Sequence, residues 1–442
     1  MSLEQRIVLP HSYSPKPGEK CFLFLQGPHG PFFDQLARLL RAAGSSVWRA
    51  GFNAGDEFFW SDRNRFIPHA GPVEDWPDHL KRIIDEKGVT DIVLYGDVRP
   101  VHAAARKAAA VRGLRLHVFE EGYLRPYWIS YERGGSNGHS ALTRMSIDEM
   151  RRTLRHAEEG LERPPTHWGD TRQHKFYGAF YHFLILAANR RYPRFRSHRA
   201  ITVRREFRLN LRRLLVTPLQ SVQRRLAERR LQRGGWPFVL VLMQLEHDAS
   251  FQAHSDFKRI EDFTDLCLKE FAQNAPCYHH IVFKAHPLED GRSDIRAAIF
   301  RTAERLGIAD RVHWVLGGRL SQTMGQCRSV VTVNSTAAQQ ALWRGLPVKA
   351  LGRAVYSKPE LVSDQSLGDF MRHPKLPDRA AYRDFRDFLL QSSQVPGGYY
   401  AQRSRGHALR VVCDMVLADE DPYESLAAGR AALRQQLADQ VK

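Results

Sequence analysis

Long hydrophobic runs are absent from this chain of 442 residues. No apolar stretch reaches the ~18–20 residues that a transmembrane helix requires. The first residues also carry no signal-peptide core. We therefore expect a cytoplasmic protein that is at most peripheral to a membrane. A chain of this length can form two domains with full-sized cores.

Cysteine is scarce and scattered, which disfavours a disulfide framework and a structural zinc site. The five cysteines stand at positions 21, 267, 277, 327 and 413, with no C-x-x-C pair. Such a set is typical of reduced, buried thiols in a cytosolic protein. The chain also lacks G-x-x-x-x-G-K-[ST] and G-x-S-x-G. One D-x-D, Asp419-Glu420-Asp421, lies beyond the second sheet pattern in an expected helix-ending loop, so we assign no metal site.

Acidic residues are outnumbered by basic ones, and the imbalance is local. Against 66 Lys+Arg stand 48 Asp+Glu, which gives a net charge of +18. Between Arg190 and Arg233 there are fifteen arginines and two acids, so this segment carries +13 of that total. Such a segment attracts a polyanion, either nucleic acid or an anionic membrane. No helix-turn-helix, zinc or RRM signature is present, so we expect no nucleic-acid partner.

An apolar and aromatic run of 13 residues, 176–188, immediately precedes the arginines. It is too short to span a bilayer but can lie in the interface with its aromatic side chains inward. We expect residues 176–233 to hold the protein on an anionic membrane surface. The alternative is a solvated pair of interdomain helices whose arginines neutralise acidic loops.

Both halves of the chain alternate apolar strand-like runs with helical patterns. The first half predicts strands at 21–26, 46–49, 91–96 and 114–119 and helices at 33–42 and 101–111. The second half predicts strands at 238–244, 278–285, 313–316, 329–333 and 347–351 and helices at 255–274, 294–306 and 335–345. This alternation is typical of α/β domains with doubly wound parallel sheets.

These patterns suggest four segments. They are a Rossmann-like domain at 1–170, an apolar and arginine-rich helical linker at 171–235, a second Rossmann-like domain at 236–400 and a helical tail at 401–442. In open α/β sheets the ligand binds at the carboxyl ends of the strands. The polar residues that follow the strands are therefore the candidates for chemistry.

In the first half, Glu120 and Glu121 follow an expected strand, and Gly122 permits a sharp turn. A half-buried carboxylate there can act as a general acid or base, and the alternative is a solvated loop with two acids. The loop after the first strand holds four candidates for substrate binding, where glycines permit close approach of a ligand. They are Gln26, Gly27, His29 and Gly30.

In the second half, His286 precedes Pro287 at a strand end, where an imidazole can donate to a phosphate. Asn334, Ser335 and Thr336 open an expected helix, which suits either a plain cap or an anion site. A carboxylate after the strand at 238–244 could be a nucleophile, or a capping acid. The remaining candidates there are Gln244, Glu246, Asp248 and Lys284.

Together these motifs resemble the bacterial capsule polysaccharide biosynthesis and export family, of the KpsS/LipB type. The resemblance extends from about residue 20 to 390. It rests on the stretches Gln26–Phe33, Gly96–Pro100, Phe119–Pro126, Gln244–Ser250, Lys284–Pro287, Asn334–Thr336 and Gly345–Val348.

The resemblance implies a GT-B-like fold, with two Rossmann-like domains that face each other across a cleft. It implies a retaining β-Kdo glycosyltransferase that moves Kdo from CMP-Kdo to a lysophosphatidylglycerol-type lipid. That reaction takes place at the inner face of the inner membrane, needs no cofactor beyond its donor, and has a second Kdo transferase and the capsule export machinery as further partners.

By the same likeness, Asp248 is the nucleophile and Glu121 the acid/base, with Glu246 and Glu120 as alternatives. A double displacement needs two carboxylates, ~5 Å apart in retaining glycosidases. His286 and the residues 334–336 would hold the CMP phosphate and the sugar carboxylate. Three rival functions stay open: an inverting CMP-sialic-acid-type transferase, a non-enzymatic export component, and a nucleic-acid-binding protein.

Overall fold

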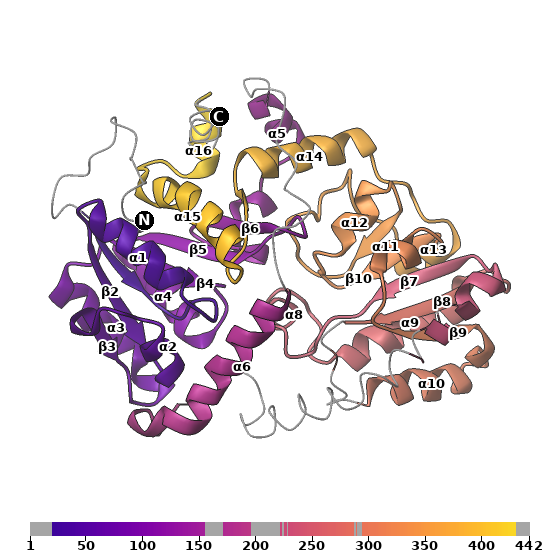
Figure 1. Cartoon of the computed structure of the whole chain (residues 1–442). Coiled ribbons are helices and arrows are strands. Elements are labelled where there is room, and N and C mark those ends of the chain that lie inside the picture. Colours follow the sequence, from indigo (N-terminus) through magenta and orange to yellow (C-terminus); the bar gives the residue numbers. More distant parts are fainter. Residues whose placement is uncertain are drawn as a thin grey trace. The chain divides into compact units, whose positions relative to one another are not determined.

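The chain forms two units, each built around one sheet (Figure 1). The computed structural model describes residues 20–154, 171–195, 222, 225–227, 229–286, 289 and 294–429. The first unit comprises residues 1–141, 152–198 and 387–442, and the second comprises 142–151 and 199–386. The chain passes between them within η5 (Ala141–Thr143), α5 (Ile147–Leu154) and α14 (Arg379–Gln391).

In the first unit, strands and helices alternate through the first 133 residues, and three elements from the C-terminal part of the chain join them. The elements of the first unit are, in chain order, β1 (Cys21–Phe24), α1 (Phe32–Ala42), β2 (Ser46–Gly51), α2 (Ala54–Phe58), η2 (Arg63–Arg65), β3 (Phe66–Pro68), η3 (Val73–Asp75), α3 (Trp76–Lys87), β4 (Asp91–Tyr95), α4 (Pro100–Arg112), β5 (Arg115–Glu121), β6 (Trp128–Arg133), η4 (Asn137–His139), α6 (Thr171–Ala188), η6 (Asn189–Arg191), β12 (Gln394–Pro396), α15 (Gln402–Leu417) and α16 (Pro422–Ala427).

The sheet of the first unit has the order β12-β6-β5-β4-β1-β2-β3. Its strands are parallel except for β6, which runs antiparallel to both of its neighbours. Side chains alternate along β1, so Phe22 and Phe24 join one core with α1 and α15, while Leu23 joins a second core with α3 and α4. Helices therefore cover both faces, as predicted for a doubly wound sheet.

The second unit repeats the design with a smaller sheet. Its elements are β7 (Phe238–Leu242), α8 (Ala249–Ala253), α9 (Ile260–Asn274), β8 (His280–Ala285), α10 (Ile295–Arg305), η7 (Ala309–Arg311), β9 (Val312–Leu316), α11 (Leu320–Met324), β10 (Ser329–Thr332), α12 (Ala338–Trp343), β11 (Val348–Ala350) and α13 (Leu367–Arg372). The strand order is β11-β10-β7-β8-β9, and every pair is parallel. Strand β7 is buried along its whole length, as its continuous apolar sequence predicts.

Three predicted boundaries are wrong. Strand β5 does not stop at residue 119, because β6 pairs with it as far as Glu121. The helix expected from residue 255 begins at Ile260, where the Glu246 carboxylate accepts the first backbone N–H. The helix expected from residue 335 begins at Ala338, after a turn.

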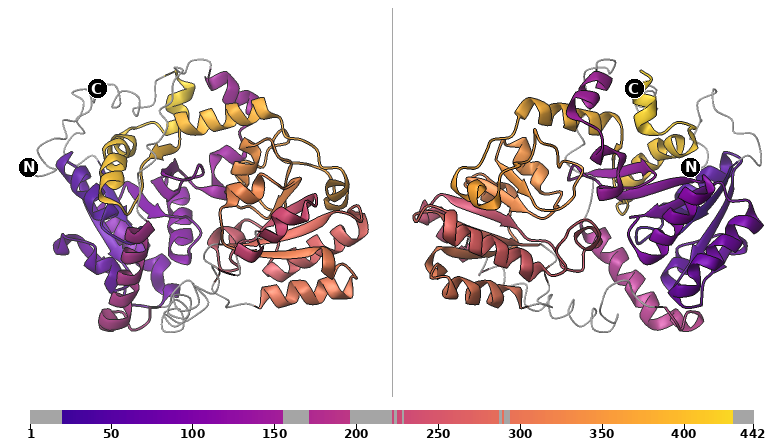
Figure 2. Two further views of the ribbon diagram at one scale, coloured as in Figure 1. Left: turned by 45° about the vertical axis from the view of Figure 1, so that its right-hand side comes forward. Right: turned by 180° about the vertical axis from the view of Figure 1, so that it is seen from behind.

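The C-terminal segment does not form a separate tail, contrary to the expected boundary at residue 400. Helix α15 packs against α1, as the left view of Figure 2 shows. Val412 and Val416 lie in the same core as Phe24. The face of α15 that meets α1 is therefore apolar, and the first unit buries it.

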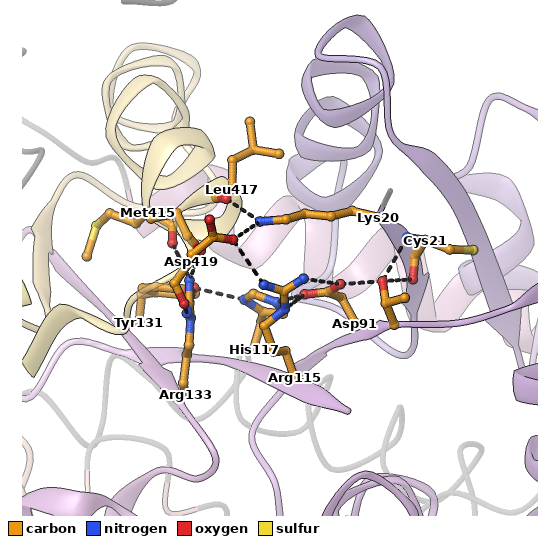
Figure 3. Close-up of polar contacts among 12 residues, drawn as sticks. Lys20, Cys21, Asp91, Arg115, His117, Tyr131, Arg133, Met415, Leu417 and Asp419 are labelled. Atoms are coloured by element: carbon orange, nitrogen blue, oxygen red, sulfur yellow. Dashed lines mark hydrogen bonds and ion pairs between the residues drawn. The ribbon is translucent and has the colours of Figure 1, made fainter. Parts of the chain in front are cut away.

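A set of cations holds the C-terminal end of α15 (Figure 3). The Lys20 ammonium group donates to the carbonyl oxygen of Leu417, and the Arg133 guanidinium group donates to those of Met415 and Ala418. A helix leaves its last carbonyl groups unpaired and carries partial negative charge there, so basic side chains stabilise this end.

The D-x-D at the C-terminus is engaged in these structural contacts. Asp419 accepts hydrogen bonds from Lys20 at 3.1 Å and from Arg115 at 3.3 Å. Asp421 caps α16 and accepts from the backbone N–H groups of Tyr423 and Glu424. Asp419 thus pairs with cations beside the end of α15, whereas Asp421 serves as a helix cap.

The same network contains a buried Asp91–His117 pair. His117 Nε2 lies 2.8 Å from Asp91 Oδ1, and its Nδ1 lies 2.8 Å from the Tyr131 hydroxyl. Burial lowers the pKa of His117 despite the nearby carboxylate. Burial alone would raise the pKa of Asp91, but hydrogen bonds from His117 and Thr90 and the charge of Arg115 bring it below its ordinary value.

All five cysteines are free, and four are buried as expected. Cys277 is exposed, so the expectation of buried thiols is wrong at that position. Among the described residues, no helix has both the length and the hydropathy needed to cross a membrane.

A buried glutamate in β6 makes the first unit sensitive to pH. The Glu132 carboxyl group accepts hydrogen bonds from the hydroxyl groups of Tyr123, Ser140 and Tyr423. Burial raises the pKa of Glu132 from 4.5 to about 7, although these hydroxyl groups oppose the shift. The folded protein therefore holds this proton across a pH range in which the unfolded chain has lost it.

We predict that the stability of the first unit falls as the pH rises from about 4.5 to about 7, by at most about 3 kcal/mol from this group. Glu132→Gln removes the titrating group and should flatten that fall. Thermal melting at pH 5 and pH 8 measures it. The exposed Glu74→Gln is the matched control and should melt like wild type at both values. An unchanged pH dependence in Glu132→Gln would contradict the prediction.

Candidate functional site

The acid pair of the first unit lies at the carboxyl end of β5, and both side chains are half-buried. The Tyr95 hydroxyl donates to Glu121 Oε1 at 3.1 Å, and Asn137 Nδ2 donates to Glu120 Oε2 at 3.4 Å. The Tyr399 hydroxyl donates to the backbone carbonyl of Glu120 at 2.7 Å. Residues from β4, from η4 and from the segment after β12 thus converge on this strand end.

Three tyrosines around the acid pair remain protonated. Burial, followed by the negative charge of Glu121, raises the pKa of Tyr95, Tyr399 and Tyr400. Their phenol groups are therefore hydrogen-bond donors at neutral pH. A carboxylate that accepts such a bond can exchange a proton with a bound hydroxyl group.

No sequence pattern assigned a role to Tyr95, Asn137, Tyr399 or Tyr400. A weak signal was available for the last two, because they follow Gly397-Gly398 directly after β12. His174 of α6 stacks on Tyr400 with ring centroids 4.2 Å apart and an interplanar angle of 4°. No sequence pattern could have shown that β12 joins the first sheet.

Gly122 is required by close packing rather than by an unusual backbone angle. A Cβ on Gly122 would lie 2.3 Å from the backbone oxygen of Trp128. The Gly122 N–H donates to that same oxygen at 3.0 Å. The glycine therefore allows β6 to return against β5 immediately after the acid pair.

The Gly96–Pro100 motif positions the turn that carries Asn137. Asp97 is 1% exposed, and its Oδ2 accepts from His139 Nδ1 at 2.9 Å and from the Ser136 N–H at 3.3 Å. The Gly96 N–H donates to the Phe119 carbonyl at 2.8 Å. The motif residues thus support the acid pair from the adjacent strand.

The loop after β1 is engaged with protein groups. Gln26 Nε2 donates to Asp56 Oδ2 at 3.1 Å, and the His29 ring stacks on Tyr181 at 4.3 Å. A Cβ on Gly27 would meet the Phe33 ring at 2.5 Å, and one on Gly30 would meet the Tyr177 ring at 3.3 Å. Gly27 thus lies against the protein's own aromatic ring, and Gly30 has a φ of 123°, which favours glycine. The role of this loop in substrate binding stays a prediction.

In the second unit, Gln244 and Asn334 bind each other through their amide groups. Gln244 Nε2 donates to Asn334 Oδ1 at 2.7 Å, and the Asn334 N–H donates to Gln244 Oε1 at 3.0 Å. Asn334 Nδ2 also donates to the carbonyl groups of Ser250 and His254. Both side chains are buried, so this pair joins the loops after β7 and β10.

The two candidate nucleophiles cap helices. Asp248 is the N-cap of α8, and its Oδ1 accepts the Ser250 N–H at 3.0 Å. Glu246 Oε2 accepts the Ile260 N–H at 3.0 Å at the start of α9. Each capping bond uses one carboxylate oxygen and fixes the orientation of the side chain.

The other candidates follow β8 and β10. Lys284 is buried and donates to the Gly317 carbonyl after β9. His286 directly follows β8 and is half-buried, while Pro287 lies outside the described residues. Ser335 Oγ accepts the Ala337 N–H at 3.3 Å, which is a local turn contact, and Thr336 lies in the same turn.

The motif residues are thus gathered at the carboxyl ends of strands in each unit. The first unit offers two carboxylates beside protonated phenol groups, which suits proton transfer. The second offers carboxylates, an imidazole and backbone N–H groups, which suits an anionic or electrophilic ligand. Of the arginine-rich segment, residues 196–221, 223, 224 and 228 lie outside the described residues.

Comparison with known proteins gives a consistent family. Residues 90–400 match the family model described as "Capsule polysaccharide biosynthesis protein". The Escherichia coli capsule polysaccharide export protein KpsS is 30% identical over 382 residues, which are 86% of this chain and 97% of that protein. The capsule polysaccharide modification protein LipB of Neisseria meningitidis serogroup A is 31% identical over 388 residues, 86% of this chain and 91% of that protein.

Among solved structures, a β-Kdo 2,7-transferase KpsC from Thermosulfurimonas dismutans is similar at a TM-score of 0.44 and 12% identity. The match covers 90% of this chain and 99% of that one. A likeness this distant does not bear on activity.

We predict that Asn334→Ala lowers the stability of the second unit by about 1–3 kcal/mol, because it leaves the buried Nε2 group of Gln244 without its acceptor, Asn334 Oδ1. Gln244→Ala should cost a similar amount, and the double variant less than the sum. Thermal melting measures all three, and Ser335→Ala is the control with a single turn contact to lose. Additive losses would show that the two amides do not act as a pair.

Proposed function

The chain belongs to the capsule polysaccharide biosynthesis protein family, and from this premise we propose that it is a retaining β-Kdo glycosyltransferase. Its donor is CMP-Kdo and its acceptor a lysophosphatidylglycerol-type lipid. The observation that carries the proposal is the placement of the motif residues. Each unit is a Rossmann-like sheet with carboxylates at the carboxyl end of a strand, β5 in one and β7 in the other.

The first step of the proposed reaction is nucleophilic displacement. The Asp248 carboxylate attacks the anomeric carbon of Kdo, and the bond to the CMP phosphate breaks with its electron pair leaving on the phosphate oxygen. A glycosyl ester of Asp248 results. The capping bond from the Ser250 N–H supports this role, because it holds one oxygen and orients the other.

The second step transfers the sugar to the acceptor. Glu121 removes the proton from the acceptor hydroxyl group, whose oxygen attacks the same carbon and releases Asp248. Two inversions give net retention. The Tyr95 hydroxyl supports this role, because it is a neutral donor that fixes the Glu121 carboxylate. Glu120 and Glu246 are the alternatives for the two roles.

We assign the CMP phosphate and the sugar carboxylate to His286 and to the turn of Ser335 and Thr336. The imidazole can donate to an anion, and the turn presents backbone N–H groups. Gln244 and Asn334 shape this region through their mutual bonds, and Lys284 fixes the end of β8 against Gly317.

The acceptor places the enzyme at the inner face of the inner membrane, as a peripheral protein. A second Kdo transferase and the capsule export machinery are its proposed partners. The decisive experiment is incubation of the full chain with CMP-Kdo and a fluorescent lysophosphatidylglycerol, with mass analysis of the product. A lipid heavier by Kdo supports the proposal, and NMR of its anomeric centre distinguishes retention from inversion. Absence of any product would favour a non-enzymatic role in export.

We predict that Asp248→Asn and Glu121→Gln each reduce turnover at least about 1,000-fold, the scale of losing an essential nucleophile or acid/base. Both substitutions preserve shape: asparagine is an equally good N-cap, and glutamine can still accept from Tyr95. Glu246→Gln and Glu120→Gln are the matched controls and should keep most activity. If Glu246→Gln abolishes turnover and Asp248→Asn does not, the nucleophile is Glu246.

We predict that His286→Ala weakens CMP binding and lowers turnover together, because a donor to the phosphate is lost. Ser335→Ala should have the same effect more mildly, about 0.5–1.5 kcal/mol for one hydrogen bond. Calorimetric titration with CMP measures both. Unchanged CMP affinity in both variants would remove these residues from the nucleotide site.

A further inference from the structure

The first unit carries an exposed aromatic surface formed by α2 and α6. We call it the aromatic ridge, and it consists of Phe58, Phe59, Phe176, Phe180 and Phe183. Phe58 is 50% exposed, Phe176 is 63% exposed and Phe183 is 57% exposed. Figure 1 shows α6 beside α2. Large apolar groups that gather on a surface in this way mark an interaction site.

The ridge is continuous although its parts are far apart in the sequence. The rings of Phe58 and Phe180 meet edge to face with centroids 5.2 Å apart. Along α6, Phe180 also contacts Phe176 at 5.9 Å and Phe183 at 6.4 Å. These three residues are spaced by four and three positions, so they share one face of the helix.

The opposite face of α6 fixes the direction in which the ridge points. Tyr181 is 8% exposed, and its hydroxyl donates to the buried Asp56 at 2.9 Å while accepting from Asn53 at 2.8 Å. Asn189 Oδ1 accepts the Ala54 N–H at 2.9 Å. Hydrogen bonds thus hold α6 against α2, so its phenylalanine rings are exposed on a helix whose orientation is fixed.

Charge identifies the partner. Residues 171–195 contain no acid and five basic residues, all exposed: Arg172, Lys175, Arg190, Arg191 and Arg194. The nearby Glu57 is paired with Arg191 at 2.8 Å and with Arg63 at 3.9 Å. The ridge is therefore an apolar strip with cations at both ends, which matches an anionic bilayer, where rings enter the interface and cations meet headgroups.

A second copy of the chain fits the ridge less well. A two-fold contact would bring the same cations of both copies together, with no acid in the segment to balance them. We propose that the aromatic ridge inserts into an anionic phospholipid bilayer and so seats the first unit on the membrane. This inference deepens the proposed function, because it assigns the membrane contact to particular side chains and rests on a lipid acceptor.

The sequence suggested that the whole run 176–188 lies in the membrane interface. The structure divides it, because Tyr181 and Ile185 are buried in the first unit while Phe176 and Phe183 face outward. It also adds Phe58, which no sequence argument placed beside the run. The test therefore replaces outward residues alone.

The experiment is co-sedimentation of the full chain with vesicles of phosphatidylcholine alone or with about one third phosphatidylglycerol. Phe176→Ser/Phe183→Ser should lower partitioning onto the anionic vesicles at least about ten-fold, because two rings lose their apolar environment. Arg172→Gln/Lys175→Gln should lower it on anionic vesicles only. Val111→Ser is the matched control, since Val111 is an apolar residue of the same unit that is 86% exposed, and it should bind like wild type.

Wild-type binding by Phe176→Ser/Phe183→Ser would overturn the inference. A second outcome would also overturn it. In that outcome the wild type does not bind vesicles but forms a dimer in analytical ultracentrifugation, and Phe176→Ser/Phe183→Ser abolishes the dimer. Activity on a soluble acceptor analogue separates this inference from the proposed function. Retained transfer by the ridge variant with lost vesicle binding supports both, whereas vesicle binding by a wild type without transferase activity supports the ridge alone.

Discussion

The contact on which the first unit depends is the bonding of cations to the C-terminal end of α15. Lys20 and Arg133 donate to the last carbonyl groups of the helix and hold it against the sheet. The helix then covers α1, and the chain before it supplies the edge strand β12. Because the C-terminal part of the chain joins the first sheet in this way, the Tyr399 hydroxyl reaches the backbone carbonyl of Glu120, which lies 279 residues earlier. The acid pair of the first unit is therefore completed by the C-terminal part of the chain.

The carboxylates of the second unit show that a structural role and a chemical role need not exclude each other. Asp248 and Glu246 each give one oxygen to a helix N-terminus, a contact worth about 1 kcal/mol. A side chain held in this way loses little further entropy when it meets a substrate. Capping is thus a means of fixing a carboxylate at a strand end, and it explains why two acids stand two residues apart.

Helix α6 illustrates how one apolar run can serve two surroundings. Its Tyr181 side is bound to Asp56 and Asn53 in the core, and its Phe176 side is exposed. The helical repeat divides the run, since residues four and three positions apart share a face. An apolar helix without such a division would be wholly buried or would span a membrane, and neither describes this one.

The sequence by itself determined the α/β class, the two sheets, most strand positions and the family. Those features follow from short-range periodicity and from motifs that are contiguous in the chain. Tertiary structure decided the rest: Tyr95 and Tyr399 around the acid pair, the Gln244–Asn334 bonds, and Phe58 beside α6. These contacts join residues distant in sequence, and a linear pattern carries no record of which strand ends become neighbours. Hydrogen-bonding groups and apolar faces find such partners only when the chain is folded, because the geometry that pairs them is a property of the whole fold.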